Sequence, residues 1–311
     1  MLTAEQLPTI AGLVPILATP FGPDGSLDLP GLRRLTEFQL ASGVHGVAVL
    51  GMASEAFALT ADERRVVTRE VVDVVANAAP LVVGVAATST VTAVEQAAEA
   101  AAAGASAVMV LPPFMVPPSP AQLPAFYAEV AEVGIEVMVQ DAPGVTGVAM
   151  SPPQIAELST VPGVTSVKVE APPTAPKVAA VVDRIEEPGF VVLGGQNAQF
   201  LLDELAAGAV GTMPACEIPD LLAPVVDDWR AGRYDDARTR FDLLLPLLVY
   251  GLQSGIAWAV HKEVLVCRGL IDDATVRVPA RALDARAKAG LTAILDRLDL
   301  PAASASLTGI H

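Results

Sequence analysis

Short runs of aliphatic and β-branched residues recur along the chain, and each is followed by a longer, Ala-rich segment whose apolar residues return at helical spacing. The short runs occupy residues 13–18, 46–50, 81–85, 107–111, 136–140, 165–169, 190–193 and 209–213. The helical segments between them occupy residues 30–43, 60–79, 91–104, 120–133, 151–160, 174–186 and 197–207. Continuous apolar strands that alternate with helices predict a parallel sheet buried on both faces.

The number of these units decides between the α/β architectures. Eight strand–helix units in about 230 residues are typical of a (β/α)₈ TIM barrel, whereas a doubly wound sheet of this length has fewer strands. Thr60 and Ser151 mark two helix starts, the first by a capping box and the second by a following proline. After the eighth run the pattern is helical only, at 220–232, 235–252, 256–268 and 280–298. We therefore predict a barrel over residues 1–230 and a C-terminal helical extension over residues 231–311 that packs on it.

The charge balance and the length of the apolar runs exclude some classes of binding partner. The 311-residue chain carries 35 acidic against 19 basic residues, and its formal net charge of −16 repels a phosphate backbone or an anionic lipid surface. Every apolar run is broken by Gly, Pro or a charge before the ~18 to 20 residues that a membrane span requires. We therefore expect a soluble protein that binds neither nucleic acid nor a membrane.

The N-terminus and the cysteines bear on the compartment and on metal binding. Met1–Ile10 contains an acid and a proline where a secretory signal has a basic patch and an apolar stretch, which predicts a cytoplasmic protein. Cys216 and Cys267 lie far apart without further ligands at metal spacing, so we expect two small core residues and no zinc site or disulfide. No metal or catalytic cluster is expected around the three isolated histidines, His45, His261 and His311.

Candidate chemistry lies at the strand ends, because barrel enzymes place their reacting groups where strands end and βα loops begin. Glycine after a strand, as at Gly51 and Gly195, either marks a turn or lets backbone N–H groups face the mouth and hold a carboxylate. The segments at these ends are Gly51–Glu55, Pro112–Met115, Gln140–Pro143, Lys168 with Glu170, Gly194–Asn197 and Met213–Cys216.

Lys168 differs from the other three lysines because it alone lies inside an apolar strand. An ammonium in a barrel interior is costly unless it is paired or neutralised, and a neutral amine is a nucleophile. The functional interpretation is that Lys168 attacks a ketone and forms a Schiff base that serves as an electron sink. The structural alternative is a lysine at a strand end that reaches solvent or pairs with Glu170.

Glu170 follows Lys168 by two positions, so both side chains project to the same side if the strand continues that far. A carboxylate beside the amine can orient it and can then move a proton at the carbon next to the iminium. A plain ion pair between the two residues is the alternative.

The motifs together resemble the dihydrodipicolinate synthase and N-acetylneuraminate lyase superfamily. The matching segments are Gly12–Phe21, Gly51–Glu55, Gln140–Pro143, Val167–Lys168 and Gly208–Met213, so the similarity covers nearly the whole chain. The resemblance implies a (β/α)₈ barrel with a C-terminal helical extension and a homotetramer built as a dimer of dimers. It also implies that Lys168 forms a Schiff base with a 2-keto acid without a metal or organic cofactor.

The departures from the family pattern are equally informative. The tyrosine that relays protons in the synthase and the lyase is replaced by Gln140, which is neither a general acid nor a general base. Two threonines of the glycine-rich turn are replaced by Met52 and Ala53, the neighbouring subunit's tyrosine by Met115, and the carboxylate-binding arginine by Val145. These changes argue against dihydrodipicolinate synthase activity and against ordinary sialic acid lyase activity.

The combined pattern is most similar to the L-2-keto-3-deoxyarabonate dehydratase-like branch. On that resemblance Glu170 removes a C3 proton, and the C4 hydroxyl leaves with proton donation from Ser54, Glu170 or a water bound to Gln140. The substrate carboxylate would rest on N–H groups of Ala53 and Ser54. The other residues expected to bind the substrate are Gly51, Gly195 and Met213. A pyruvate-forming aldolase in which water or Ser54 replaces the phenol, and a barrel that only binds a keto acid, are the alternatives.

Overall fold

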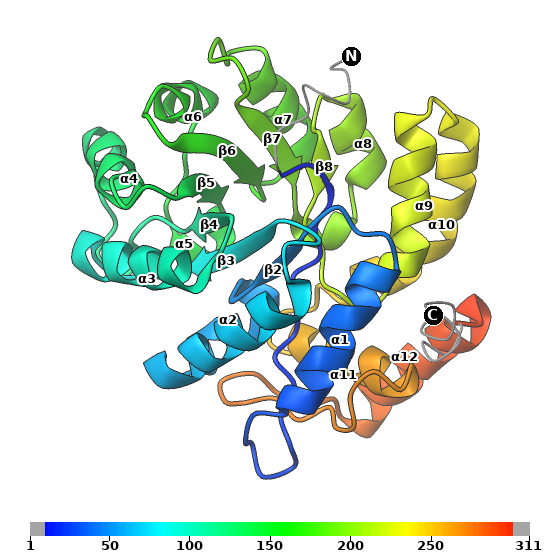
Figure 1. Cartoon of the computed structure of the whole chain (residues 1–311). Coiled ribbons are helices and arrows are strands. Elements are labelled where there is room, and N and C mark those ends of the chain that lie inside the picture. Colours follow the sequence, from blue (N-terminus) through cyan, green and yellow to red (C-terminus); the bar gives the residue numbers. More distant parts are fainter. Residues whose placement is uncertain (1–9, 301–311) are drawn as a thin grey trace.

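Eight parallel strands form the centre of the molecule in a computed structural model that describes residues 10–300 (Figure 1). The chain before Ile10, which we expect to lack a secretory signal, lies outside these residues, as does His311. The strands pair in the order β1-β8-β7-β6-β5-β4-β3-β2. Their bounds are β1 (Gly12–Leu13), β2 (Val47–Val49), β3 (Leu81–Val85), β4 (Ala107–Val110), β5 (Glu136–Asp141), β6 (Val164–Val169), β7 (Val191–Gly194) and β8 (Gly211–Thr212).

Ile16 closes the ring between the first and last strands of that order. It forms parallel bridges both to Ala48 in β2 and to Ala215 just after β8. β1 and β8 are shorter than the predicted runs because Pro15 and Pro214 interrupt the hydrogen-bonded ladder, since proline has no N–H to donate. The predicted TIM barrel is therefore confirmed, with small differences at the strand ends.

The side chains on the two faces of the strands belong to two different apolar clusters. Val14, Met109, Met138 and Leu193 belong to a cluster that fills the barrel interior. Alternate residues point outward into a second cluster shared with the surrounding helices. Both faces are apolar, so a polar side chain on a strand is an exception that needs an explanation.

The helices follow the strands as predicted and cover the outside of the barrel (Figure 1). The capping boxes at Thr60 and Ser151 are both present. The bounds are α1 (Leu29–Ala41), α2 (Ala61–Val75), α3 (Thr90–Ala103), α4 (Leu123–Ala131), α5 (Pro143–Thr146), α6 (Pro152–Ser159), α7 (Thr174–Val182), α8 (Leu201–Ala206), α9 (Pro219–Arg230), α10 (Tyr234–Tyr250), α11 (Ala257–Cys267) and α12 (Ala285–Leu298). None of the helices between residues 10 and 300 is long and apolar enough to cross a membrane.

The C-terminal helices share one apolar cluster with α8, α9 and Leu13 of β1. Within it α10 lies along α9 and α12 lies along α10, whereas α11 reaches the turn after β2. There the indole N–H of Trp258 donates to the Met52 carbonyl at 2.7 Å, and Lys262 forms a buried ion pair with Glu55 at 2.5 Å. The extension therefore helps to build the barrel mouth.

Candidate active site

Lys168 and Glu170 project side by side from the end of β6. Lys168 is 1% exposed, and its Nζ lies 3.1 Å from Oε1 of Glu170. The side chain does not reach solvent, so the first structural alternative for Lys168 is wrong. Ionisable side chains that meet out of water at the mouth of a barrel are candidates for a functional site.

Glu170 is held from several directions. Its Oε2 accepts a hydrogen bond from the amide of Gln140 at 2.7 Å, and the backbone N–H of Gln196 lies 3.4 Å from Oε1. Gln140 stands opposite Lys168 in the register of β5 and β6. Gly195 leaves the room that Glu170 needs, because a Cβ there would lie 2.4 Å from Cγ of Glu170. Three other residues predicted from the sequence, Lys168, Gln140 and Gly195, thus meet at the Glu170 side chain.

The chain after β7 adopts backbone conformations that are unusual for residues with side chains. Gln196, Asn197 and Ala198 have φ values of 49°, 51° and 59°. The Asn197 side chain bridges the loop after β8 and the end of α10, accepting from the Ala215 N–H and donating to the Leu248 carbonyl, both at 3.0 Å. Strained backbone held by such contacts is common at functional sites.

The glycine-rich turn after β2 forms the opposite wall of the mouth. It contains a short 3-10 helix, Met52–Ser54, followed by Glu55 in the left-handed conformation with φ 55°. Ser54 is fully buried; its hydroxyl donates to the Leu17 carbonyl at 2.5 Å and its N–H to the Gly51 carbonyl at 3.0 Å. The predicted proton-donating role of Ser54 thus finds no support in this geometry, because its hydroxyl is bonded away from the mouth.

Two hollows open at the barrel mouth. The first, of about 160 Å³, contains Lys168 and Glu170, and its wall includes Met52, Ala53, Met213, Trp258 and His261. The second, of about 340 Å³, has a largely apolar wall that includes Gly51, Phe114, Gln140, Val145 and Trp258. The mouth therefore combines one hollow that contains titratable side chains with a second hollow that is almost entirely apolar.

His261 and Glu217 form a buried pair at the hollow that contains Lys168 and Glu170. Nδ1 of His261 lies 2.9 Å from Oε1 of Glu217, and the two side chains are 7% and 1% exposed. The sequence patterns assembled no cluster around a histidine, so they did not predict this contact. The residues are 44 positions apart and in elements of different type, so no spacing signal could have found them.

Glu204 is a second buried acid that the sequence did not reveal. It extends from α8 to the outer side of β7, where its carboxylate takes the space that a side chain at Gly194 would need. Burial, together with the negative charge of Glu170, raises the pKa of Glu204 to about 7. The group therefore titrates near neutral pH although it lies outside the barrel wall.

The cysteines divide between core and surface. Cys216 is buried as expected; burial raises the pKa of its thiol to about 12, which makes it unreactive. Cys267 is exposed, so the prediction of a core residue is wrong for it, because it lies on a face of the last turn of α11 that the barrel does not cover. In residues 10–300 no three His, Cys, Asp or Glu side chains gather in a way that could hold a metal ion.

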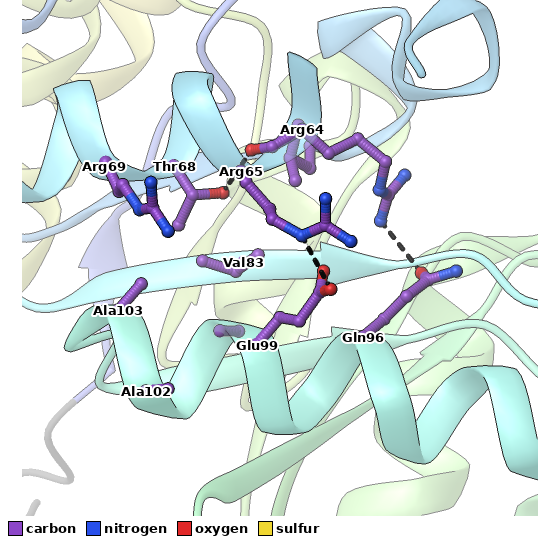
Figure 2. A pocket seen from close by; sticks show the side chains of 11 residues that line it. Arg64, Arg65, Thr68, Arg69, Val83, Gln96, Glu99, Ala102 and Ala103 are labelled. Atoms are coloured by element: carbon purple, nitrogen blue, oxygen red, sulfur yellow. Dashed lines mark hydrogen bonds and ion pairs between the residues drawn. The ribbon is translucent and has the colours of Figure 1, made fainter. Parts of the chain in front are cut away.

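A third hollow, of about 270 Å³, lies outside the barrel between α2 and α3 (Figure 2). Arg65 pairs there with Glu99 at 2.8 Å, and Arg64 donates to Gln96 at 2.8 Å. None of its wall residues belongs to the hollow around Lys168. Arg65 and Glu99 are a charged pair, whereas Arg64 bonds to the neutral amide of Gln96, and the hollow contains no nucleophile next to an acid or base.

A buried amine and a carboxylate held beside it lie at the carboxyl end of a closed parallel barrel, which is where barrel enzymes place their reacting groups. The dihydrodipicolinate synthetase family model matches residues 9–298, and the chain belongs to this family. The enzymes of the family are lyases.

Named relatives differ in their activities. The chain is 36% identical to the L-2-keto-3-deoxyarabonate dehydratase of Azospirillum brasilense, over 96% of this chain and 97% of the relative. It is also 36% identical to the 4-hydroxy-tetrahydrodipicolinate synthase of Xanthomonas axonopodis pv. citri, over 74% of this chain and 76% of that enzyme.

Solved structures show the same fold. The dihydrodipicolinate synthase of Rhodopseudomonas palustris superposes with a TM-score of 0.87 at 30% identity, covering 94% of this chain and 98% of the other. A prophage protein of the dihydrodipicolinic acid synthase family from E. coli K12, solved with pyruvate, has a TM-score of 0.87 at 26% identity, covering 94% and 99%.

Proposed function

We propose that the protein is a Schiff-base hydro-lyase that dehydrates a 2-keto-3-deoxy sugar acid of the L-2-keto-3-deoxyarabonate type to 2-oxoglutarate semialdehyde and water. The observation that carries this proposal is the Glu170 carboxylate, fixed by Gln140 at 2.7 Å and placed 3.1 Å from the Lys168 amine. On this proposal Lys168 forms the Schiff base and Glu170 is the base for the neighbouring carbon. The 36% identity to an L-2-keto-3-deoxyarabonate dehydratase over 96% of the chain supports the substrate class.

In the proposed reaction Lys168 condenses with C2, and the substrate carboxylate rests on the turn after β2. The Ala53 N–H is our donor for the carboxylate, because Ser54 already uses its own N–H within the turn. Glu170 removes a proton from C3 and leaves an enamine. The enamine then expels the C4 hydroxyl, and hydrolysis of the conjugated iminium with tautomerisation releases the semialdehyde.

Gln140 favours dehydration over aldol cleavage. Retro-aldol cleavage needs a base at the C4 hydroxyl, and the side chain opposite Lys168 is an amide, which does not act as a general base at neutral pH. The aldolase remains the second candidate, because relatives such as the Xanthomonas enzyme are synthases that belong to the same family.

The decisive experiment supplies L-2-keto-3-deoxyarabonate and follows the semialdehyde through an NAD-linked aldehyde dehydrogenase. A parallel reaction with lactate dehydrogenase detects pyruvate. We expect semialdehyde from the natural protein and none from Lys168→Ala. Pyruvate as the sole product would replace the dehydratase by the aldolase, and no turnover at all would leave a barrel that only binds keto acids.

We also propose that the protein works in the cytoplasm as a homotetramer. Phe114, Met115 and Val116, in the loop after β4, are 36%, 75% and 76% exposed, which is a large apolar area to leave in water. Light scattering after gel filtration tests the assembly, and a monomeric mass at micromolar concentration would contradict it.

A further inference from the structure

The His261–Glu217 pair brings an acid–base group from the C-terminal extension to the reacting centre. His261 lies on α11 and Glu217 in the segment between β8 and α9, and His261 contributes to the wall of the hollow that contains Lys168 and Glu170. The pair is not part of the reaction as described above. An inference from it therefore deepens the proposed dehydratase function and rests on it.

Contacts on one side of the ring determine which nitrogen is available. Glu217 occupies Nδ1, and Gly251 lies against the same edge, because a Cβ there would approach Cε1 of His261 to 2.8 Å. Nε2 has no hydrogen-bond partner among the residues that the structure describes. A carboxylate on Nδ1 with a free Nε2 is the arrangement by which a histidine is oriented toward a substrate.

Other polar groups of this hollow are already committed. The Asn197 amide bridges the loop after β8 and the end of α10, and the Gln196 side chain donates to the Glu170 carbonyl at 2.8 Å. In the proposed reaction Lys168 bonds to C2 and Glu170 takes the C3 proton. His261 is the further titratable wall residue, and dehydration still lacks a donor for the leaving oxygen.

The ring of His261 faces a carboxylate that keeps its negative charge. Burial raises the pKa of Glu217, but the attraction and hydrogen bond of His261 outweigh burial, so the pKa of Glu217 is lowered and it stays ionised. Arg268, at the end of α11, donates to the Glu217 carbonyl at 2.7 Å. The remaining charges near the ring are paired: Arg268 with Asp220, Lys168 with Glu170, and Lys262 with Glu55.

We propose that His261, oriented by Glu217, is the general acid that protonates the departing C4 hydroxyl. The C4–O bond breaks and its electron pair leaves with the oxygen, which takes the proton from Nε2 and departs as water. The enamine nitrogen lone pair forms the iminium while the electrons at C3 form the C3=C4 bond. The neutral ring regains its proton from solvent, and Glu170 releases the C3 proton before the next cycle.

The test compares His261→Gln with His45→Gln, a histidine variant outside the mouth. We expect His261→Gln to lower kcat for dehydration by about 10²- to 10³-fold, and His45→Gln to leave kcat unchanged. Because chloride leaves without a proton, His261→Gln should eliminate chloride from 4-chloro-2-oxopentanoate within threefold of the natural rate. Glu217→Gln should lower dehydration about tenfold with the same rescue.

Equal losses on the hydroxyl and chloro substrates, or a loss below threefold on the hydroxyl substrate, would overturn the assignment of His261. Borohydride trapping with pyruvate reports whether each variant is folded and still forms the Schiff base. If His261→Gln forms no trapped adduct, the rescue of Glu217→Gln decides the question. Failure of the dehydratase proposal looks different, because the natural protein itself then produces no semialdehyde.

Discussion

Two groups of charged side chains in this barrel have similar contact distances but different surroundings. Between α2 and α3, the side chains of Arg65 and Glu99 meet at 2.8 Å and are 38% and 35% exposed (Figure 2). At the mouth, Lys168 and Glu170 meet at 3.1 Å and are 1% and 7% exposed. The hollow between α2 and α3, at about 270 Å³, is also larger than the hollow around Lys168, at about 160 Å³.

The difference shows that neither the number of charges nor the size of a hollow identifies the reacting centre. Water solvates the outer pair, so its formation gains little free energy. The inner pair has lost its water, and a charge there is destabilising unless a partner compensates it. Burial of Lys168 and Glu170 beside a hollow at the barrel mouth is the reason why we propose chemistry there, whereas the solvated Arg65–Glu99 pair gives no such reason.

The sharpest break of the comparison is Lys168→Ala. We expect turnover to fall to the limit of detection and borohydride reduction with pyruvate to leave the protein unmodified, because the attacking amine is gone. Peptide mass mapping of the natural protein should place the trapped adduct on Lys168. An adduct on Lys177 or Lys262 in folded protein would contradict the assignment.

Glu170→Gln keeps the shape of the side chain and removes the base. We expect kcat to fall by about 10²- to 10⁴-fold while trapping with pyruvate continues, because condensation at C2 does not use the C3 proton. Steady-state rates and trapping yields measure the two steps separately. A parallel loss of both would mean that Glu170 serves mainly to position the amine.

Glu204→Gln tests a buried acid that lies outside the mouth. The pKa rises from 4.5 to about 7 on folding, so the folded state binds the proton more tightly and natural stability falls as pH rises from 4.5 to 7. Once the pH has passed 7, the free energy of unfolding has fallen by about 3 kcal/mol, at ~1.4 kcal/mol for each pKa unit. Urea unfolding at pH 5 and pH 8 should show this fall in the natural protein and not in the variant.

The smallest effect is expected for Arg65→Ala in the outer hollow. Because the ion pair with Glu99 is more than one-third exposed, we expect the free energy of unfolding to change by less than about 1 kcal/mol and kcat to stay unchanged. A tenfold loss of activity would mean that the outer charges act on the mouth, and would remove the distinction between the two regions.

Local patterns were sufficient for the fold and for the residues of single strands. The alternation of apolar runs and helical segments led to the barrel, and the capping boxes at Thr60 and Ser151 formed as predicted. Lys168 and Glu170 project together because side chains two apart on a strand share a face. Gln140 was found by its place at the end of β5, and the parallel register then set it against Lys168.

Contacts between distant segments were beyond prediction. Ser54 has a hydroxyl and follows a strand, as a proton donor would, but this hydroxyl donates to the carbonyl of Leu17, 37 positions away. Cys267 has the residue type of a core position, yet it lies on an exposed face of α11. The sequence around His261 and Glu204 did not single them out. Their burial depends on which distant segments pack over them.

The sequence by itself determined the order of strands and helices, the closed parallel barrel and the lysine at its sixth strand, since these follow from short-range periodicity and from where one charge interrupts an apolar run. Only the tertiary structure decided which side chains share the mouth with Lys168 and which lose their water. Burial and hydrogen-bond partners depend on how the C-terminal helices pack on the barrel. This packing joins residues far apart in the chain, so the pattern of neighbouring residues does not predict it.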